Sequence, residues 1–235
     1  MPIWIPPVIA FLLGSIPFGL LIAKSQGINI REHGSGNIGA TNVLRVVGKK
    51  FGISCFILDF IKGLVPSLIG ISLIQYAGQD QTMTIKALSS WATTFPADSR
   101  ASIQTLQLAT GLCAILGHNY SPWVGFKGGK GIATSAGVFC AFAPFAIPVL
   151  ILVWCAFFFT TRYVSVASIA ASIGLPLTVL WGSWFHGKIA DGSWNKPLFF
   201  FSLFIGAMAV WKHRSNIKKL MNGTDNRFSP KKNNP

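Results

Sequence analysis

The sequence predicts an all-α polytopic membrane protein with seven transmembrane helices. Of its 235 residues, 51% are apolar and only 11% are charged, whereas about a quarter of the residues in an ordinary soluble domain are charged. The apolar residues form continuous runs, and several of these runs approach the roughly 20 residues with which a helix crosses a bilayer. A membrane β-barrel would instead need short segments of alternating polarity.

The first three spans can be placed from their flanking charges. The run Ile3–Ala23 has no Lys or Arg before it, and Lys24 follows it. We therefore expect an uncleaved span with its N-terminus outside the cell. Phe51–Tyr76 is the second predicted span and Ser102–Gly117 the third. The polar stretch Gly78–Ala101 between them is expected to form an outside loop.

The next apolar stretch is best interpreted as two helices. Residues 131–161 comprise 31 residues, which are too many for one straight span and few for two full ones. Lys130 and Arg162 flank the stretch, and both favour the inner side of the membrane. Pro144 and Pro148 near its middle mark a possible turn. We therefore expect two short helices paired as a hairpin.

The last two spans are Val164–Phe185 and Pro197–Trp211. Residues 1–217 then form the transmembrane domain, and residues 218–235 form a basic tail on the inside. Most of the 20 Lys and Arg residues fall on inside segments of this topology, which is typical of membrane proteins. The same bias explains the net charge of +14, so a nucleic-acid partner is not expected.

A glycine-rich loop, Gly34–Asn42, follows the first span, and Arg45 lies just beyond it. Glycines let backbone N–H groups converge on an anion, and hydroxyl and amide side chains add donors. A polar turn that caps the next helix explains the loop alone equally well. Arg45 favours phosphate binding, because a guanidinium can donate two parallel hydrogen bonds. The candidate residues here are Ser35, Gly36, Asn37, Thr41, Asn42 and Arg45.

A second glycine-rich loop, Phe126–Thr134, lies on the same side of the membrane in this topology. A helix that starts directly after it would add the positive end of its dipole to the charge of Lys130. The loop is not a Walker A motif, because Val124 and Gly131 stand where that motif needs glycine and Ser or Thr. A flexible basic turn at the membrane surface is the alternative. The candidate residues are Lys127, Gly128, Gly129, Lys130, Gly131 and Thr134.

Two histidines near these loops are candidates for binding or proton transfer. His118 ends the third span just before the second loop, and His213 follows the last span. Histidine suits proton transfer near neutral pH, although a single interfacial histidine is more often structural. His213 and Asn216 are three residues apart, so a continuing helix would place both on one face.

A metal centre is not predicted. The inside segments carry few carboxylates, and none of the four cysteines forms a Cys-x-x-Cys pair. Mg²⁺ and Zn²⁺ sites need clustered Asp, Glu, His or Cys. The pattern therefore argues against lipid phosphotransferases with aspartate-bound metals. It also argues against acyltransferases with a His-x4-Asp motif, since no Asp follows His118 at that spacing.

Together these motifs resemble the bacterial integral-membrane acyl-phosphate:glycerol-3-phosphate acyltransferase family. The resembling stretches occur in the family's order. They are Gly14–Gly19, Gly34–Asn42 with Arg45, Leu58–Gly63, Gly117–Tyr120 running into Phe126–Thr134, and His213–Ile217. One departure is the outside stretch Gly78–Ala101, which is longer than the family leads us to expect.

The resemblance implies seven transmembrane helices in the bacterial inner membrane, with the active site on the cytoplasmic face. It implies transfer of a fatty acyl group from acyl phosphate to the 1-hydroxyl of glycerol 3-phosphate, which gives lysophosphatidic acid and phosphate. The partners would be these two substrates and the lipid bilayer, without a cofactor, and a monomer is expected. The family's motifs map catalytic roles onto Ser35, Arg45, Lys130, His213 and Asn216.

The residues themselves fit such chemistry, because an acyl phosphate is already activated and needs positioning and cations more than a strong acid. We place the acyl-phosphate head on the Lys130 loop, and glycerol 3-phosphate near Ser35, Arg45, His213 and Asn216. The base is open between His213 and the substrate's own phosphate, whose second pKa is about 6. Two other functions compete with this one, a transporter of phosphate esters and a scaffold that binds anionic lipids.

Overall fold

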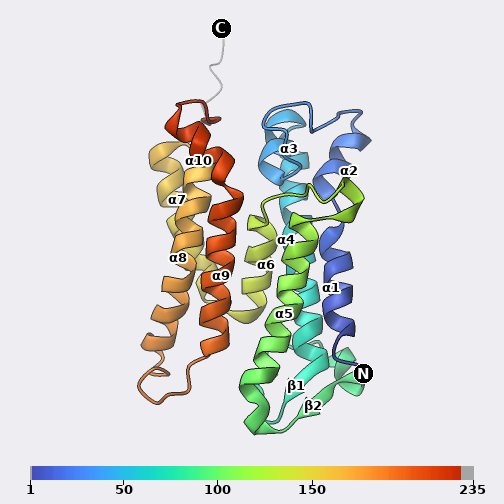
Figure 1. Ribbon diagram of the computed structural model, residues 1–235, viewed down its shortest axis with the longest axis vertical. Helices are drawn as coiled ribbons and strands as arrows, with labels where there is room; N and C mark the ends of the chain where they lie inside the picture. The colour runs from blue at the N-terminus through green and yellow to red at the C-terminus, as the bar shows by residue number, and fades with distance from the viewer. Residues whose placement is uncertain (1, 229–235) are drawn as a thin grey trace.

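The computed structural model describes residues 2–228 as a bundle of helices (Figure 1). The helices of the bundle are α1 (Ile5–Ser15), α2 (Phe18–Ser25), α3 (Ala40–Val46), α4 (Lys49–Leu73), α5 (Arg100–Asn119), α6 (Ile132–Phe142), α7 (Ala146–Thr161), α8 (Val164–Phe185), α9 (Lys196–Lys212) and α10 (Arg214–Met221). The predicted spans therefore fall mostly on helix, although the second predicted span, Phe51–Tyr76, ends in the strand residues 74–76. Three segments of the described chain are long and apolar enough to cross a membrane, namely Ile5–Ser25, Lys49–Leu73 and Val164–Phe185.

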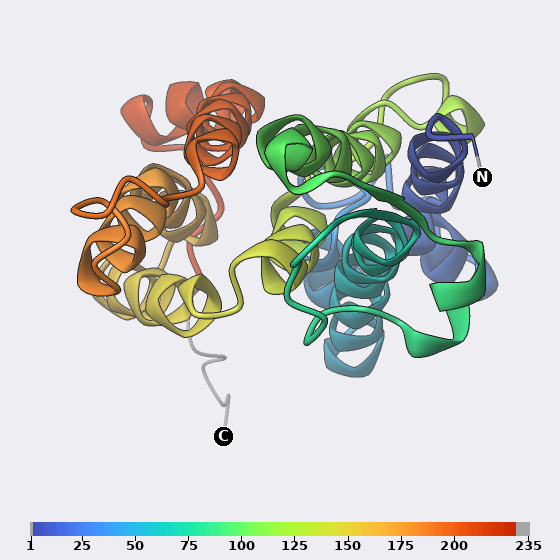
Figure 2. The same cartoon turned by 90° about the horizontal axis from the view of Figure 1, so that it is seen from below.

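The bundle has two halves, which Figure 2 shows side by side. One half contains α1, α4, α5 and α6, with α2 and α3 at one end, and the other contains α7, α8 and α9 with α10. The chain passes between the halves at the turn around Pro144, where a turn was predicted. However, α6 packs chiefly on α4, and α7 packs chiefly on α8. These two helices therefore belong to different halves.

Glycines let the helices of the first half approach closely. A Cβ atom on Gly14 would lie 2.2 Å from the carbonyl oxygen of Ala114, and one on Gly63 would lie 2.1 Å from that of Thr134. Contacts this short leave no room for any side chain, so α1 meets α5 and α4 meets α6 backbone to backbone. Such small-residue interfaces are typical of helices that pack in lipid, where dispersion and shape replace the hydrophobic effect.

The predicted first span is broken into two helices at Ile16–Pro17, because proline cannot donate a backbone hydrogen bond. The groups around this break hold other parts of the chain. Lys62 on α4 donates to the carbonyl of Ile16 at 2.8 Å. Ser121 donates its hydroxyl to the carbonyl of Ser15 at 2.6 Å. The break thus anchors α4 and the chain that leads into the second glycine loop.

Two further features differ from the sequence prediction. The stretch after α4 contains a short parallel pair of strands, β1 (Ile74–Tyr76) and β2 (Thr93–Phe95), at the end of the molecule that also carries the N-terminus (Figure 1). At the opposite end, the predicted boundary after residue 217 falls inside α10. The last part of the predicted tail, residues 229–235, lies outside the described residues.

Candidate active site

A cavity of about 760 Å³ lies between the two halves and is the centre of the candidate site. Polar side chains from both glycine loops and from the start of α10 line it. Its apolar wall comes from α4, α7 and α8, for example from Phe56, Ile151 and Leu175. A single hollow therefore combines cations and hydrogen-bonding groups with a surface suited to an alkyl chain.

The first glycine loop is organised from within by Asn42, which is only 2% exposed. Its Oδ1 accepts a hydrogen bond from the backbone N–H of Ser35 at 2.9 Å. Its Nδ2 donates to the carbonyls of His33 at 3.0 Å and Ile30 at 3.3 Å. Asn42 was predicted to bind substrate, but these bonds use its amide to shape the loop. Ser35 itself lines the cavity.

The second glycine loop lies against the end of α5. Gly128 donates its N–H to the carbonyl of Asn119 at 3.2 Å, and Gly129 donates to the carbonyl of His118 at 3.1 Å. These two N–H groups were expected to face an anion, but they are already bonded to the protein. A Cβ on Gly129 would lie 2.1 Å from Nε2 of His118. Glycine is therefore required here for close packing against the histidine.

Arg31 ties the two glycine loops together. Its guanidinium donates to the carbonyl of Lys127 at 2.9 Å and to the carbonyl of Val124 at 3.3 Å. Because these acceptors lie more than 90 positions further along the chain, no local sequence pattern points to them. The contact fixes one loop relative to the other and so sets the spacing between their side chains.

Lys130 connects the second loop to α10 through a chain of polar contacts. Its ammonium donates to Oδ1 of Asn216. The Nδ2 of Asn216 donates to both carboxylate oxygens of Asp225, at 3.1 and 3.3 Å. Ser165 at the start of α8 donates its hydroxyl to the same carboxylate at 2.5 Å. The two halves of the molecule are thus bonded to each other at this end of the cavity.

The cations of the site are held partly away from water, and their pKa values reflect this. Burial lowers the pKa of Lys130 to about 8, against the opposing influence of Asp225. Burial likewise lowers the pKa of Arg45, and Asp225 again acts in the opposite direction. A partly desolvated cation interacts with an anion more strongly than an exposed one does. An incoming phosphate would therefore be attracted and would restore the protonated form of Lys130.

His213 is buried between α9 and α10, with 3% of its surface exposed. Its Nδ1 lies 2.8 Å from the carbonyl oxygen of Ala209. A carbonyl can only accept, so Nδ1 carries the proton and Nε2 of the neutral ring is an acceptor. Burial, together with the charge of Lys130, lowers the pKa of His213 to about 4. The ring is therefore neutral at pH 7.

A buried ionic group on α4 lies beside His118, the residue against which the second loop packs. Asp59 and Lys62, three residues apart on α4, form an ion pair of 2.7 Å, and both side chains are about 4% exposed. His118 places its Nδ1 3.6 Å from Asp59. Removing one partner of such a pair leaves an uncompensated buried charge, which typically costs about 3–5 kcal/mol. Among residues 2–228, no group of three or more His, Cys, Asp or Glu side chains could hold a metal ion.

The structure brings all five predicted catalytic residues to one cavity and separates some of the predicted binding residues from them. Ser35, Arg45, Lys130, His213 and Asn216 all line the cavity. So do Asn37, Thr41, Asn42, His118 and Gly131. The remainder are not part of its wall: Thr134 is fully buried, the side chain of Lys127 is exposed, and Gly36, Gly128 and Gly129 lie within the turns of the loops.

Sequence reasoning missed three residues that organise the site. Arg31, Ser165 and Asp225 were not among the predicted site residues. Proline at position 17 could have revealed the break that anchors the second loop. Nothing local could have revealed Asp225, because its partner Ser165 is 60 positions away.

Comparison with known proteins assigns the family. A sequence model of the family described as glycerol-3-phosphate acyltransferase matches residues 4–223. The chain is 40% identical to a glycerol-3-phosphate acyltransferase of Aquifex aeolicus over 221 residues, which cover 94% of this chain and 96% of that protein. The chain belongs to the glycerol-3-phosphate acyltransferase family.

Other members of the glycerol-3-phosphate acyltransferase family agree with this assignment. A relative from Geotalea daltonii is 39% identical over 219 residues, covering 93% of this chain and 94% of that protein. A crystal structure of an integral membrane glycerol 3-phosphate acyltransferase in its glycerol 3-phosphate form superposes with a TM-score of 0.75 at 38% identity, covering 97% and 96% of the two chains. The lysophosphatidic acid form gives a TM-score of 0.73 with 97% and 95% coverage. The family thus has an integral membrane fold that this chain shares.

Proposed function

We propose that this protein transfers a fatty acyl group from acyl phosphate to the 1-hydroxyl of glycerol 3-phosphate, releasing lysophosphatidic acid and phosphate. The observation that carries the proposal is the single cavity in which Arg45 and Lys130 of the two glycine loops meet His213 and Asn216. The solved relatives, in glycerol 3-phosphate and lysophosphatidic acid forms, support the same substrate and product.

Each substrate has a phosphate, and the cavity offers each one a cation. Lys130 would hold the phosphate of the acyl donor, at the N-terminal end of α6, whose dipole adds positive potential. Arg45 would hold glycerol 3-phosphate, with Ser35 and Asn216 as neutral donors near it. Two separate cations offset the repulsion between the phosphates, so both substrates can be bound at once.

The reaction then requires alignment and one proton transfer. The 1-hydroxyl oxygen attacks the carbonyl carbon, a new ester C–O bond forms, and the bond from that carbon to the phosphate oxygen breaks. Phosphate leaves with the bonding electron pair, and the hydroxyl proton passes to a base. Holding the two reactants in this geometry can contribute about 7–11 kcal/mol to lowering the barrier.

The phosphate of glycerol 3-phosphate is the base that we favour. Its second pKa of about 6 suits proton transfer at neutral pH. The pKa of His213, lowered to about 4, makes its Nε2 a weak base. His213 would instead accept a hydrogen bond from the glycerol and orient it, because its Nδ1 proton is committed to Ala209.

The acyl chain would occupy the apolar part of the cavity. The wall there includes Ile53 and Phe56 of α4 and Ile151 of α7, and each of these side chains is about half exposed. In a lipid bilayer such side chains face acyl chains. An acyl phosphate could therefore enter with its chain from the lipid while its head reaches Lys130.

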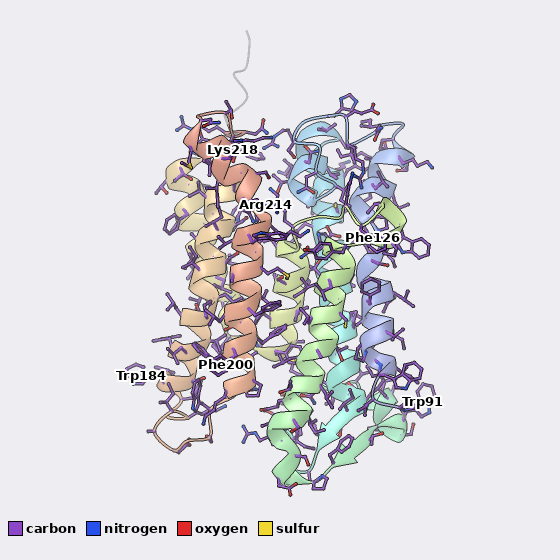
Figure 3. All side chains as sticks on the ribbon, in the orientation of Figure 1. Trp91, Phe126, Trp184, Phe200, Arg214 and Lys218 are labelled. Carbon is purple, nitrogen blue, oxygen red and sulfur yellow. The ribbon has the colours of Figure 1, made fainter. Side chains whose placement is uncertain are left out.

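We propose that the protein acts as a monomer in the bacterial inner membrane with seven spans, two of which are the short helices α6 and α7. The N-terminus would lie outside and the cavity's polar end in the cytoplasm. Lys218 and Arg214 lie toward that end in Figure 3, whereas Trp91 and Trp184 lie toward the other. Basic residues favour the inner side, and exposed tryptophans favour the interface.

A transporter of phosphate esters is the competing function, and a product assay separates the two. Purified protein in detergent, with acyl phosphate, glycerol 3-phosphate and EDTA, is expected to form lysophosphatidic acid and phosphate in equal amounts. EDTA is included because no metal is expected to take part. A transporter would form neither product. In a separate assay with sealed vesicles, it would instead move glycerol 3-phosphate across the membrane.

A further inference from the structure

The chain after α10 folds back over the polar end of the cavity. Helix α10 ends at Met221, and Asp225, Asn226 and Phe228 then contribute to the cavity wall. The backbone N–H of Phe228 donates to the carbonyl of Arg162 at 2.9 Å, which fastens the segment to the turn between α7 and α8. The match to the family model ends at residue 223, so these contacts come from chain beyond that match.

Asp225 places a carboxylate among the groups that we assign to substrate phosphate. It accepts hydrogen bonds from Asn216 at 3.1 Å and from Ser165 at 2.5 Å. It is also close enough to Lys130 and Arg45 to act on the pKa of both. A carboxylate and a phosphate are recognised by the same cations and donors, so the two anions would compete for them.

Phe228 covers the second cation of the site. The guanidinium carbon of Arg45 lies 5.2 Å from the centre of the Phe228 ring, within the range of a cation–π contact. The same ring meets Phe158 of α7 edge to face at 5.8 Å. Phe228 therefore bridges the two halves across the opening and occupies one face of a guanidinium that would bind phosphate.

We propose that residues 222–228 form a strap in which Asp225 competes with glycerol 3-phosphate for the anion site and so sets its apparent affinity. The inference rests on the proposed function. The strap has no regular secondary structure and is held mainly by the side chains of Asp225 and Phe228, so local opening costs less than global unfolding. The apparent dissociation constant is then the intrinsic one divided by the fraction of molecules with the strap open. A mutation that loosens the strap should therefore tighten substrate binding.

The test compares Asp225→Asn with the wild type. The amide is nearly the same size and can still bond to Ser165 and Asn216, but it lacks the negative charge. We expect the Kd for glycerol 3-phosphate, measured by calorimetry on the full-length protein in detergent, to fall by about fivefold or more, with a parallel fall in KM. The matched control is Asp191→Asn, which removes a carboxylate from a fully exposed position elsewhere and should change neither constant.

A second variant separates the strap from a simple change of charge. Phe228→Ala leaves every charge in place but removes the contacts to Arg45 and Phe158, so it should also lower Kd and KM, by a smaller factor. If Asp225→Asn lowered kcat and left Kd and KM unchanged, Asp225 would be a positioning residue for Asn216 and the strap would be refuted. An unchanged Kd in both variants, with an active wild type, would refute it equally. If the wild-type protein neither bound glycerol 3-phosphate nor formed product, the proposed function itself would be refuted, independently of the strap.

Discussion

The ammonium of Lys130 donates a hydrogen bond to Oδ1 of Asn216, a residue 86 positions further along the chain. The contact joins the loop before α6 to α10, and therefore one half of the bundle to the other. It also sets the ammonium at the wall of the cavity, where burial lowers its pKa. The position and the pKa of this ammonium therefore depend on residues from both halves.

Replacing Lys130 tests whether this cation binds the reacting phosphate. Lys130→Ala is expected to lower kcat/KM by at least about 100-fold, which corresponds to about 2.7 kcal/mol of lost transition-state stabilisation. The measurement is steady-state formation of lysophosphatidic acid. Lys50→Ala, which removes an exposed lysine near the start of α4, should have nearly normal kinetics. Near-normal turnover in Lys130→Ala would exclude Lys130 from the site.

Arg45 gives an independent test on the other glycine loop. Arg45→Ala is expected to reduce kcat/KM by about 100-fold or more, because glycerol 3-phosphate would lose a guanidinium that can donate two parallel hydrogen bonds. Arg45→Lys should recover only part of the activity, since an ammonium keeps the charge but cannot make the paired contact. Full activity in either variant would show that glycerol 3-phosphate does not depend on Arg45.

The pKa of Lys130, lowered to about 8, predicts an alkaline limit to activity. Phosphate binding needs the protonated form, so kcat/KM should fall as pH rises through about 8. Unfolding would not explain this fall. A lysine in the unfolded chain keeps its ordinary pKa of 10.5. Between these two values the unfolded state therefore holds more protons, and this group favours folding increasingly as pH rises.

The pH experiment records kcat/KM and the thermal unfolding midpoint on the same samples between pH 6 and pH 10. The expected result is a loss of activity above about pH 8 with an intact fold. A constant kcat/KM up to pH 9.5 would mean that Lys130 is not the cation that titrates. The kcat profile should extend to higher pH, because a bound phosphate raises the pKa of Lys130.

Gly129 tests whether the packing of the second loop positions the chemistry. A methyl group there would meet Nε2 of His118 at 2.1 Å, and this histidine is buried, which limits how far it can move. We expect Gly129→Ala to shift the loop and lower kcat by about 100-fold, as small misplacements of reacting groups do. Gly174→Ala is the matched control, because its methyl group would lie an ordinary 3.7 Å from Leu150. Equal kinetics in the two variants would mean that the loop tolerates the shift.

The helices and the cavity-lining position of Lys130 could be predicted from the sequence, because both have local signatures. Apolar runs of lipid length mark the helices, and glycines around Lys130 mark the loop. The roles of Asn42 and Thr134 were harder to predict. The same polar side chains can face a ligand or bond to the loop itself, and only packing decides which. Asn42 bonds to the backbone of its own loop, and Thr134 is buried where α6 meets α4.

Contacts between distant segments could not be predicted at all. Arg31 reaches carbonyls of the chain around the second glycine loop, and Asp225 bonds to Ser165 at the start of α8. Each pairing joins segments far apart in the chain within one half of the bundle, and a single sequence has no periodic or local pattern for this. The division of α6 and α7 between the two halves was missed for the same reason, since the proline-containing turn indicated only that the helix ends there.

A donor comparison tests the central claim most directly. Purified protein is given glycerol 3-phosphate and one acyl chain carried by phosphate, by coenzyme A or by acyl carrier protein, and lysophosphatidic acid is quantified by mass spectrometry. If the cavity binds one phosphate at Arg45 and another at Lys130, acyl phosphate should be the only one of the three donors that gives product. Product from either thioester, with none from acyl phosphate, would contradict the proposed reaction.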